Sequence, residues 1–294
     1  LHDALPIYMP KGTDLSLLTE ADLDAIADRR ALYAALSALL DLGVLAERDG
    51  QIVAVLPLVE VKSRLFGHAM TSLPFAVYGG VAGADAEAIA ALETTADELA
   101  RKCGVQHLEY RNLRERHADW PRQELYFTFR KEILPDEEAN MLAIPRKQRA
   151  MVRKGIKNGL VAEVDPNADR FFALFSDNVR RHGTPALPKH FFEVLLKVFG
   201  QDCEVMTVSS PEGKPLSSVL TFYFRDEVLP YYAGDDLAAR DFAANDFKYW
   251  ELMRRACAKG YRIFDYGRSK VGTGPYSFKK NWGFEPMPLS YEYR

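Results

Sequence analysis

Two halves of the chain repeat the same series of features. Each half has a Leu-Pro-aromatic triplet, starting at Leu73 and at Leu229, and then a predicted helix that stops at a glycine, Gly104 or Gly260. Both helices lead directly into a strand that ends in an acidic residue followed by tyrosine. All three matches occur at one constant offset, without a gap. One match can arise by chance, but three at the same offset indicate a duplicated domain, which restricts the fold to two similar units.

The order of predicted elements gives these units a fold class. In the second half, the pattern predicts a basic helix over residues 145–158, two further helices, hairpin strands, a helix, a central strand over residues 261–266 and a closing strand over residues 289–293. The sheet is therefore expected to be mixed, with hairpins first and a crossover later. This order is similar to that of the GNAT acyltransferase fold. We expect an α/β chain of two tandem GNAT-like domains, residues 8–135 and 136–294, with mixed, mainly antiparallel sheets flanked by helices.

The composition excludes several classes of protein. The 294 residues are 48% hydrophobic and 27% charged, which suffices for two cores, and the formal charge of -3 argues against a general nucleic-acid coat, so no DNA partner is expected. The longest apolar run, residues 52–59, contains Pro57 and is far shorter than the ~20 residues that span a membrane. Three cysteines without a CxxC pair, and histidines without ligand spacing, predict a reduced, cytoplasmic protein with no metal site.

The first 42 residues give two separate predictions. Residues 1–7 can be written as the translation of a sequencing adapter, so we expect them to belong to no domain. Residues 22–42 carry leucine and isoleucine at helical spacing and predict a helix with a broad apolar face. The first domain is therefore expected to start in a truncated or atypical way.

The stretch over residues 261–286 has the composition of an active centre. A buried strand ends near Asp265, and a glycine-rich loop and a short amphipathic turn that carry four cations follow it. Open α/β sheets place their ligands beyond the C-terminal ends of strands. The residues predicted to contact substrate here are Arg268, Lys270, Lys280 and Trp282.

Acyl transfer to an amine assigns roles to three further residues of this stretch. Such a reaction needs a group that takes the ammonium proton, and donors or cations for the developing negative charge and for a phosphate-bearing carrier. Asp265 is suited to anchoring or deprotonating the amine. Lys279 is suited to binding carrier phosphate or stabilising the transition state, and Tyr276 to protonating a leaving oxygen. The alternative for Asp265 is structural, because a carboxylate at a buried strand end must be matched and Arg268 can match it.

A basic run over residues 146–157 forms a second candidate site. Arg149 and Arg153 share a helix face, and no acidic residue occurs between Glu138 and Glu163. Solvated helix faces usually mix both signs. The run therefore favours binding of a phosphate-bearing ligand, with a solvated face as the alternative.

Other motifs give weaker signals. Gly272-Thr-Gly274 lacks the third glycine of a dinucleotide fingerprint, and the arginine of a GNAT-type RxxGxG loop would lie one residue away from Arg268. No tightly bound cofactor is therefore predicted. Three tyrosines supply the aromatic surface of a binding cleft, or else mark strand ends next to turn glycines. They are Tyr78, Tyr231 and Tyr232.

Several segments resemble the FemAB family, and most of all its branch associated with exosortase/PEP-CTERM systems. They are IPRKQRAMVRKG at residues 144–155, GTP at 183–185, LPYYAG at 229–234, FDYGRS at 264–269 and FKKNWGF at 278–284. The resemblance implies two GNAT-like domains, a functional lysine in the FK motif, here Lys279, and transfer of an amino acid from aminoacyl-tRNA to the amine of a peptidoglycan precursor. For the exosortase branch it implies acyl or aminoacyl transfer near surface-polysaccharide assembly.

Three functions stay open at this point. The first is a FemAB-type acyl- or aminoacyltransferase, which uses acyl-CoA or aminoacyl-tRNA, acts on a glycan, peptide or other small precursor of the cell envelope or an exopolysaccharide, and contacts envelope-assembly machinery peripherally. The second is an acetyl-CoA-dependent GNAT N-acetyltransferase, although residues 243–246 lack the glycine of a pyrophosphate loop. The third is a non-catalytic subunit that binds a glycan or nucleotide sugar. The fold alone does not separate them.

Overall fold

The computed structural model of the chain describes most of its residues. These are residues 7–8, 44–63, 67–74 and 76–294. The helix predicted over residues 22–42 lies outside them. Within them, Ile7 pairs with Ala46 in a short strand, so the expectation that residues 1–7 belong to no domain is wrong for Ile7.

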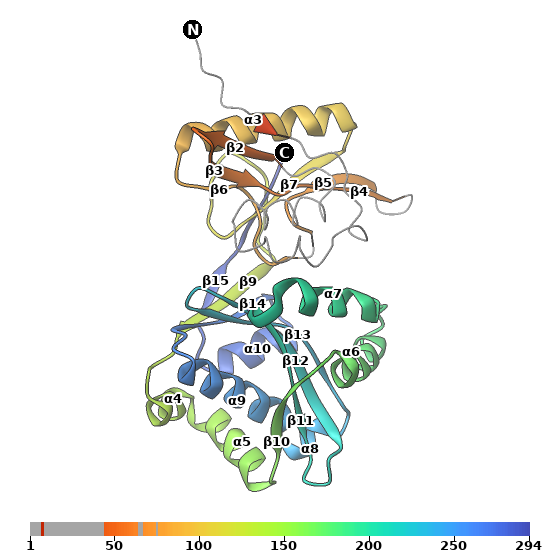
Figure 1. The fold of residues 1–294 in the computed structure, drawn as a ribbon, viewed down its shortest axis with the longest axis vertical. Coiled ribbons are helices and arrows are strands. Elements are labelled where there is room, and N and C mark those ends of the chain that lie inside the picture. The colour runs from red at the N-terminus through yellow and green to blue at the C-terminus, as the bar shows by residue number, and fades with distance from the viewer. Residues whose placement is uncertain (1–6, 9–43, 64–66, 75) are drawn as a thin grey trace. The chain divides into compact units, whose positions relative to one another are not determined.

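The chain forms two compact units (Figure 1). Unit 1 contains residues 1–126 and 288–294, and unit 2 contains residues 127–287. The sequence analysis placed the boundary at residue 135 and assigned the whole C-terminal end to the second domain. The structure differs because β9 (Tyr126–Glu132) lies in the sheet of unit 2, whereas the last strand of the chain pairs within unit 1.

Unit 1 contains two sheets and helix α3 (Ala86–Cys103), with sheet orders β1-β2-β3-β6 and β4-β5-β7-β16-β8. The strands are β1 (Ile7–Tyr8), β2 (Val44–Arg48), β3 (Gln51–Leu56), β4 (Val59–Ser63), β5 (Gly67–Thr71), β6 (Ala82–Gly83), β7 (His107–Asn112), β8 (Arg122–Gln123) and β16 (Ser290–Tyr293). Asp85 caps α3 by accepting a hydrogen bond from the N–H of Ala88 at 3.0 Å, and Gly104 ends it in the left-handed conformation. Both ends of this helix were predicted.

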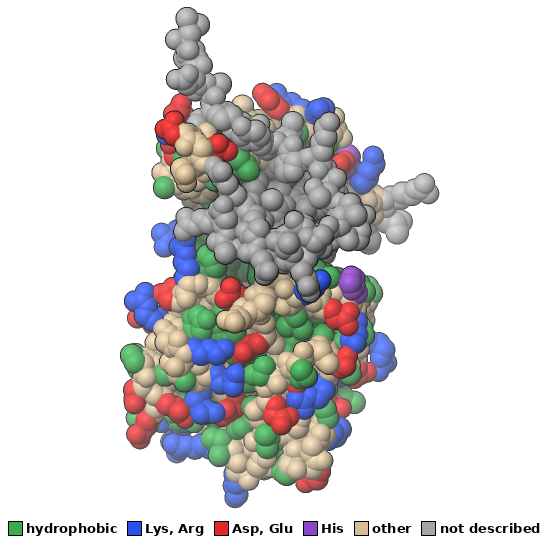
Figure 2. All heavy atoms as spheres, in the orientation of Figure 1, with side chains coloured by type: hydrophobic (Ala, Val, Ile, Leu, Met, Phe, Trp, Pro, Cys, Tyr) green, Lys and Arg blue, Asp and Glu red, His purple; other side chains and the backbone are tan. Residues whose placement is uncertain are grey.

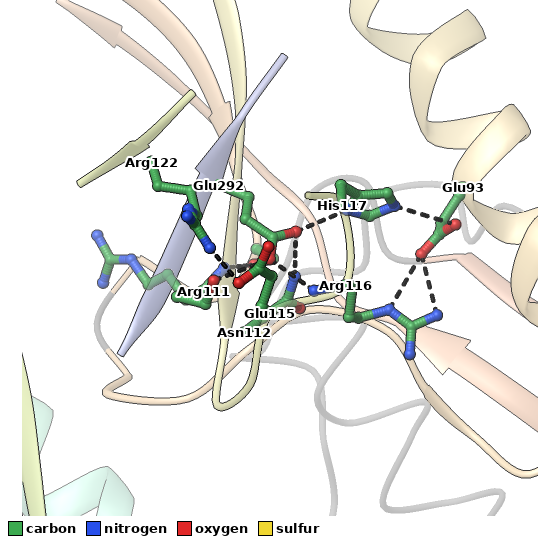
Figure 3. Close-up of polar contacts among 10 residues, drawn as sticks. Glu93, Arg111, Asn112, Glu115, Arg116, His117, Arg122 and Glu292 are labelled. Atoms are coloured by element: carbon green, nitrogen blue, oxygen red, sulfur yellow. Dashed lines mark hydrogen bonds and ion pairs between the residues drawn. The ribbon is translucent and has the colours of Figure 1, made fainter. Parts of the chain in front are cut away.

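Strand β16 lies between β7 and β8, far along the chain from both. Its Glu292 side chain is fully buried. It accepts hydrogen bonds from the side chain of Asn112 (2.9 Å) and the backbone N–H of Arg116 (2.8 Å). It also lies 2.6 Å from Nδ1 of His117 (Figure 3). These contacts explain why the predicted closing strand belongs to unit 1 and not to the sheet of unit 2.

Unit 2 is built on a sheet of order β10-β11-β12-β13-β14-β9-β15. Its further strands are β10 (Val161–Asp165), β11 (Cys203–Ser209), β12 (Pro215–Phe224), β13 (Glu227–Asp235), β14 (Ile263–Lys270) and β15 (Pro286–Pro288). Its helices are α4 (Glu137–Ala143), α5 (Arg146–Lys157), α6 (Asp169–Arg181), α7 (Lys189–Phe199), the 3-10 turn η3 (Gly200–Asp202), α8 (Ala239–Phe242), α9 (Ala244–Ala258) and α10 (Gly274–Asn281). Strands β10 to β13 pair antiparallel, and β13 pairs parallel with β14.

Helices cover both faces of this sheet (Figure 1). Val219 of β12 packs in the core that includes residues of α5 and α9, whereas the next residue, Leu220, packs in the core that includes residues of α6 and α7. Because successive strand residues point to opposite faces, α5 and α9 lie on one side of the sheet and α6 and α7 on the other.

The predicted repeat is present as a strand, a helix and a second strand parallel to the first. In unit 1 these are β5, α3 and β7, and in unit 2 they are β13, α9 and β14. Glu109 and Asp265 are each the third residue of the second strand. The two Leu-Pro pairs do not correspond, because Leu229 lies within β13 whereas Leu73 follows the end of β5.

Candidate active site

A pocket of about 340 Å3 lies at the C-terminal end of β13. The ladder between β13 and β14 covers only Glu227 with Ile263 and Val228 with Phe264, so beyond these pairs the two parallel strands are no longer joined. Crevices at the C-terminal ends of such strands are the usual ligand sites of open α/β sheets. The lining residues are Met151, Asn178, Arg181, Asp235, Asp236, Leu237, Ala239, Arg240, Ala243, Asn245, Asp246 and Phe278.

Helix α9 begins at this pocket with an unusual backbone conformation. Ala243, the residue before the helix, has a φ of 59° and provides no side-chain cap. The left-handed region costs a non-glycine residue roughly 1 kcal/mol, and such strain is concentrated at functional sites. The first N–H groups of a helix have no intrahelical acceptor, and the helix dipole favours an anion there. The start of α9 therefore offers the pocket a place for a phosphate group.

Arg240 is a pocket residue that the sequence analysis missed. Arg240, Ala243 and Asn245 have the spacing of an RxxGxG loop in which alanine and asparagine replace the glycines. The search for glycine led us to reject this loop. Ala243 nevertheless has the positive φ that glycine normally supplies. The absence of glycine at residues 243–246 therefore does not exclude a pyrophosphate loop, and the spacing of Arg240 was the signal that could have found it.

Asp246, in the first turn of α9, is a second residue that was missed. It is only 8% exposed, and it lines the pocket. Its Oδ1 accepts hydrogen bonds from Nε2 of Gln148 at 3.2 Å and from Nε1 of Trp282 at 3.0 Å. Among the described residues, Oδ2 has no hydrogen-bond partner. Burial raises the pKa of this carboxyl, because its hydrogen-bond donors are neutral and do not offset the loss of water.

Asp235, the last residue of β13, is a second carboxylate in the pocket. Its Oδ1 lies 3.0 Å from Nζ of Lys248 and accepts a hydrogen bond from the hydroxyl of Ser217. The Lys248 side chain is fully buried. A buried ammonium needs an anionic partner, and Asp235 is the partner of Lys248.

Asp265 is the third residue of β14, which continues to Lys270 and does not end near Asp265 as expected, and it lies outside the lining of this pocket. It is 1% exposed, and its Oδ2 lies 2.9 Å from Nη1 of Arg130 on β9. Arg130 also contacts Glu227 at 2.5 Å, and Oδ1 of Asp265 accepts a hydrogen bond from the N–H of Gly267 at 2.7 Å. The Arg130 contacts join β9, β13 and β14. The structure therefore supplies a cation for Asp265 that the sequence analysis did not consider.

Lys279 of α10 points at the middle of the same strand. Its Nζ donates to the backbone carbonyls of Tyr266 (2.7 Å), Gly267 (3.1 Å) and Arg268 (3.0 Å). These three acceptors occupy all the N–H groups of an ammonium. Burial lowers the pKa of Lys279 to about 7, although the negative charge of Asp265 acts in the opposite direction. In this arrangement Lys279 fixes the backbone of β14 and has no donor left for a carrier phosphate.

The remaining predicted residues of this stretch lie in different environments. Trp282 is 1% exposed, so the prediction that it contacts substrate is wrong for this structure; its indole N–H instead donates to Asp246. Tyr276 is half-buried, and its ring packs edge-on against Phe127 and Phe129 of β9. Arg268 is half-buried, and Lys270 and Lys280 are exposed. None of these residues lines the described pocket.

The basic helix α5 faces α9 through Gln148, Val152 and Gly155. At 100° per residue, Met151, which lines the pocket, lies on one flank of this buried face, and Arg149 lies on the other. Arg153 is exposed. Nε of Arg149 is buried without a hydrogen-bond partner among the described residues. On the face of unit 2 drawn in Figure 2, Lys and Arg side chains lie among Asp and Glu side chains, so that face has no extended patch of one sign.

The three predicted tyrosines belong to two different units. Tyr78 belongs to unit 1, and Tyr231 and Tyr232 belong to β13 of unit 2. Thr221 pairs with Pro230 and Leu220 with Tyr232, so Tyr231 is the extra residue of a β-bulge. Tyr232 packs edge-on against the rings of three phenylalanines from α6 and α7. Burial raises the pKa of Tyr232, as expected for a core tyrosine.

Two features are absent from the described residues. In that part of the chain, no group of three or more His, Cys, Asp or Glu side chains is placed to hold a metal ion. No helix within it is long and apolar enough to cross a membrane.

Most of unit 2 is similar to a known family of domains. Residues 144–280 match the family profile described as an acetyltransferase (GNAT) domain. A search of curated proteins found no match.

Solved structures match the chain over most of its length. A crystal structure of FemX is 16% identical over 85% of this chain and 87% of its own, with a TM-score of 0.60. The C-terminal domain of a putative lysylphosphatidylglycerol synthetase from Agrobacterium fabrum is 16% identical over 92% of both chains, with a TM-score of 0.63. A tandem GNAT protein from the clavulanic acid biosynthesis pathway is 13% identical over 99% of this chain and 98% of its own, with a TM-score of 0.56. The chain therefore has an α/β fold of two GNAT-like domains in tandem, in which residues 144–280 form a GNAT-type acyltransferase domain.

Proposed function

We propose that this chain is an N-acyltransferase of FemAB type, which transfers an acyl or aminoacyl group to an amine of a cell-envelope or exopolysaccharide precursor. The observation that carries the proposal is the pocket at the C-terminal end of β13, because it combines a helix start suited to an anion with two carboxylates suited to an amine. The FemAB-like segments and the similarity of fold to FemX support an aminoacyl donor. The link to exosortase systems and to envelope-assembly machinery rests on the resemblance alone and stays a prediction.

An acetyl-CoA-dependent N-acetyltransferase is the second candidate. The observation that favours it is the left-handed Ala243 three residues after Arg240, since this backbone can receive a pyrophosphate without glycine. GNAT enzymes use acyl-CoA as a substrate and not as a tightly bound cofactor. In both candidates Arg240 and the start of α9 hold the phosphate-bearing donor. The proposed roles of Asp265 and Lys279 become positioning roles, because their contacts hold the middle of β14.

Donor binding to purified protein tests this proposal. The probes are acetyl-CoA, an aminoacyl-adenosine that mimics the 3′ end of aminoacyl-tRNA, and a nucleotide sugar. We expect one of the first two to raise the melting temperature in a concentration-dependent way. Arg240→Gln should weaken its binding about tenfold, since a charge-assisted hydrogen bond contributes about 1.5 kcal/mol. Arg114→Gln, which removes an exposed arginine of unit 1, is the matched control.

Three outcomes separate the functions. Binding of acetyl-CoA alone selects the N-acetyltransferase, and binding of the aminoacyl-adenosine alone selects the FemAB-type enzyme. Binding of the nucleotide sugar alone, without either donor, would contradict acyl transfer and favour a binding subunit. Equal loss of affinity in the Arg240 and Arg114 variants would contradict the placement of the donor.

A further inference from the structure

Two of the three carboxylates that line the pocket, Asp235 and Asp246, are held in opposite ways. Asp235 lies beside the buried ammonium of Lys248, whereas Asp246 accepts hydrogen bonds only from the neutral groups of Gln148 and Trp282. When the surroundings of two acids in one site favour different charge states, one acid usually stays charged and the other transfers a proton. Because burial disfavours the charge of Asp246, this acid is the one of the pair suited to gaining a proton.

The other charged groups of the pocket do not change this assignment. Arg181 contacts Asp177 at 2.9 Å and donates to the backbone carbonyl of Asp235. Asp236 lies 2.9 Å from Nζ of Lys214. Arg240 is exposed at the rim. Asp246 is thus the buried acid in the lining that has no cation in contact among the described residues. Burial, which raises its pKa, is the largest effect, while the charge of Lys248 lowers this pKa and that of Asp235 raises it.

We propose that the acceptor is a primary amine bound as its ammonium ion, that Asp235 holds the charge of this ion, and that Asp246 accepts its proton. This inference rests on the acyl transfer proposed above and names the acceptor class and the base of that reaction. The uncommitted Oδ2 of Asp246 is the accepting atom. The lining also presents Leu237, 74% exposed, together with Met151 and Phe278, so the amine is carried on an apolar stem.

The step conserves atoms and charge. An N–H bond of the ammonium breaks, and its proton passes to Oδ2 of Asp246. The freed lone pair forms the C–N bond with the acyl carbon of the donor, while the bond from that carbon to the CoA sulfur or the ribose oxygen breaks. The nitrogen now carries two hydrogens, and one of them leaves as a proton that the departing sulfur or oxygen takes up. Asp246 then releases its own proton to water and returns to the carboxylate.

Amine binding tests the first half of the proposal without any donor. n-Pentylamine should bind to the wild-type protein, and 1-pentanol, which has the same stem and no charge, should bind at least tenfold more weakly, as measured by calorimetry at pH 7. Asp235→Asn should weaken the binding of pentylamine about tenfold or more. Asp241→Asn changes the same charge at an exposed position of α8 outside the pocket and should leave binding unchanged. Equal affinity for the amine and the alcohol, or unchanged binding in Asp235→Asn, would overturn the ammonium site.

The pH profile of transfer tests the second half. With whichever donor is active and pentylamine as acceptor, Asp246→Asn should lower kcat by about a hundredfold or more, as expected for loss of a general base. The wild-type rate should rise with pH through the pKa of Asp246, and this limb should be absent in Asp246→Asn. If Asp246→Asn keeps both the rise of the rate with pH and the wild-type kcat, Asp246 takes no part in the reaction. If neither donor supports transfer, the proposed function fails, and the amine-binding result still decides the ammonium site on its own.

Discussion

Gly234 of β13 lies where this strand meets α6, and we expect Gly234→Ala to disturb both stability and the pocket. A Cβ atom at this position would lie less than 3.0 Å from the backbone N and Cα of Phe175, a separation that real Cβ atoms do not show. The obstacle is helix backbone and not a flexible side chain, so α6 must move as a whole. Overpacking of a core costs typically 1–3 kcal/mol, and we expect about 3 kcal/mol here because no side chain can rotate away.

The displaced helix also carries part of the site. Asn178 and Arg181 of α6 line the pocket, so its movement should weaken donor binding as well. Urea denaturation followed by circular dichroism measures the stability, and donor affinity is measured on the folded variant. Gly274→Ala is the matched control, because a Cβ there meets no atom within 4 Å and the residue is in the first turn of α10. A loss in Gly234→Ala below about 0.5 kcal/mol, the range of ordinary surface changes, would refute this account of the contact.

Two further variants test the roles of individual charged groups. Lys279→Ala should lower the free energy of unfolding by up to about 3 kcal/mol, since three hydrogen bonds to backbone carbonyls contribute about 1 kcal/mol each. Because burial lowers the pKa of Lys279 to about 7, the wild type gains stability as pH rises above 7, so the loss should be larger at pH 9 than at pH 7. Urea denaturation at both pH values measures it, and a nearly unchanged midpoint at pH 9 would argue against the positioning role. Asp246→Asn should be at least as stable as the wild type at pH 7. The folded state raises the pKa of Asp246, so the wild type loses stability as pH rises above the unfolded value of about 3.9, and the advantage of Asn should grow between pH 4 and 7. Denaturation at both pH values checks this, and an advantage that shrinks toward pH 7 would contradict the raised pKa.

Local signals in the sequence predicted local structure correctly. The cap at Asp85 and the glycine at Gly104 define α3 through contacts within a few residues, and the strand–helix–strand repeat follows from periodicity in each half. The sheet to which the last strand, β16, belongs could not be predicted in this way. Its alternation marks a strand, but Glu292 finds its partners in a segment about 175 residues earlier.

The candidate site was missed for the same physical reason. Asp246 is one polar residue among several at the start of a helix, and its function depends on Gln148, 98 residues away, and Trp282, 36 residues away. Asp265 stood out in the sequence because it ends a buried strand, but its partner Arg130 is 135 residues distant. Glycine was also treated as the only sign of a left-handed turn, although Ala243 adopts one. Residue type and spacing therefore indicated residues 261–286, whereas the described pocket takes most of its lining from residues outside that stretch.

Hydrogen exchange of the donor-bound protein tests the central claim most directly. In the proposed function, the acyl donor binds at the C-terminal end of β13, against the start of α9. Addition of the donor that raises the melting temperature should slow amide exchange in peptides that cover residues 237–248. Peptides over residues 200–204, which line a separate pocket of about 630 Å3, should exchange as before. Protection at residues 200–204 without protection at residues 237–248 would contradict the account.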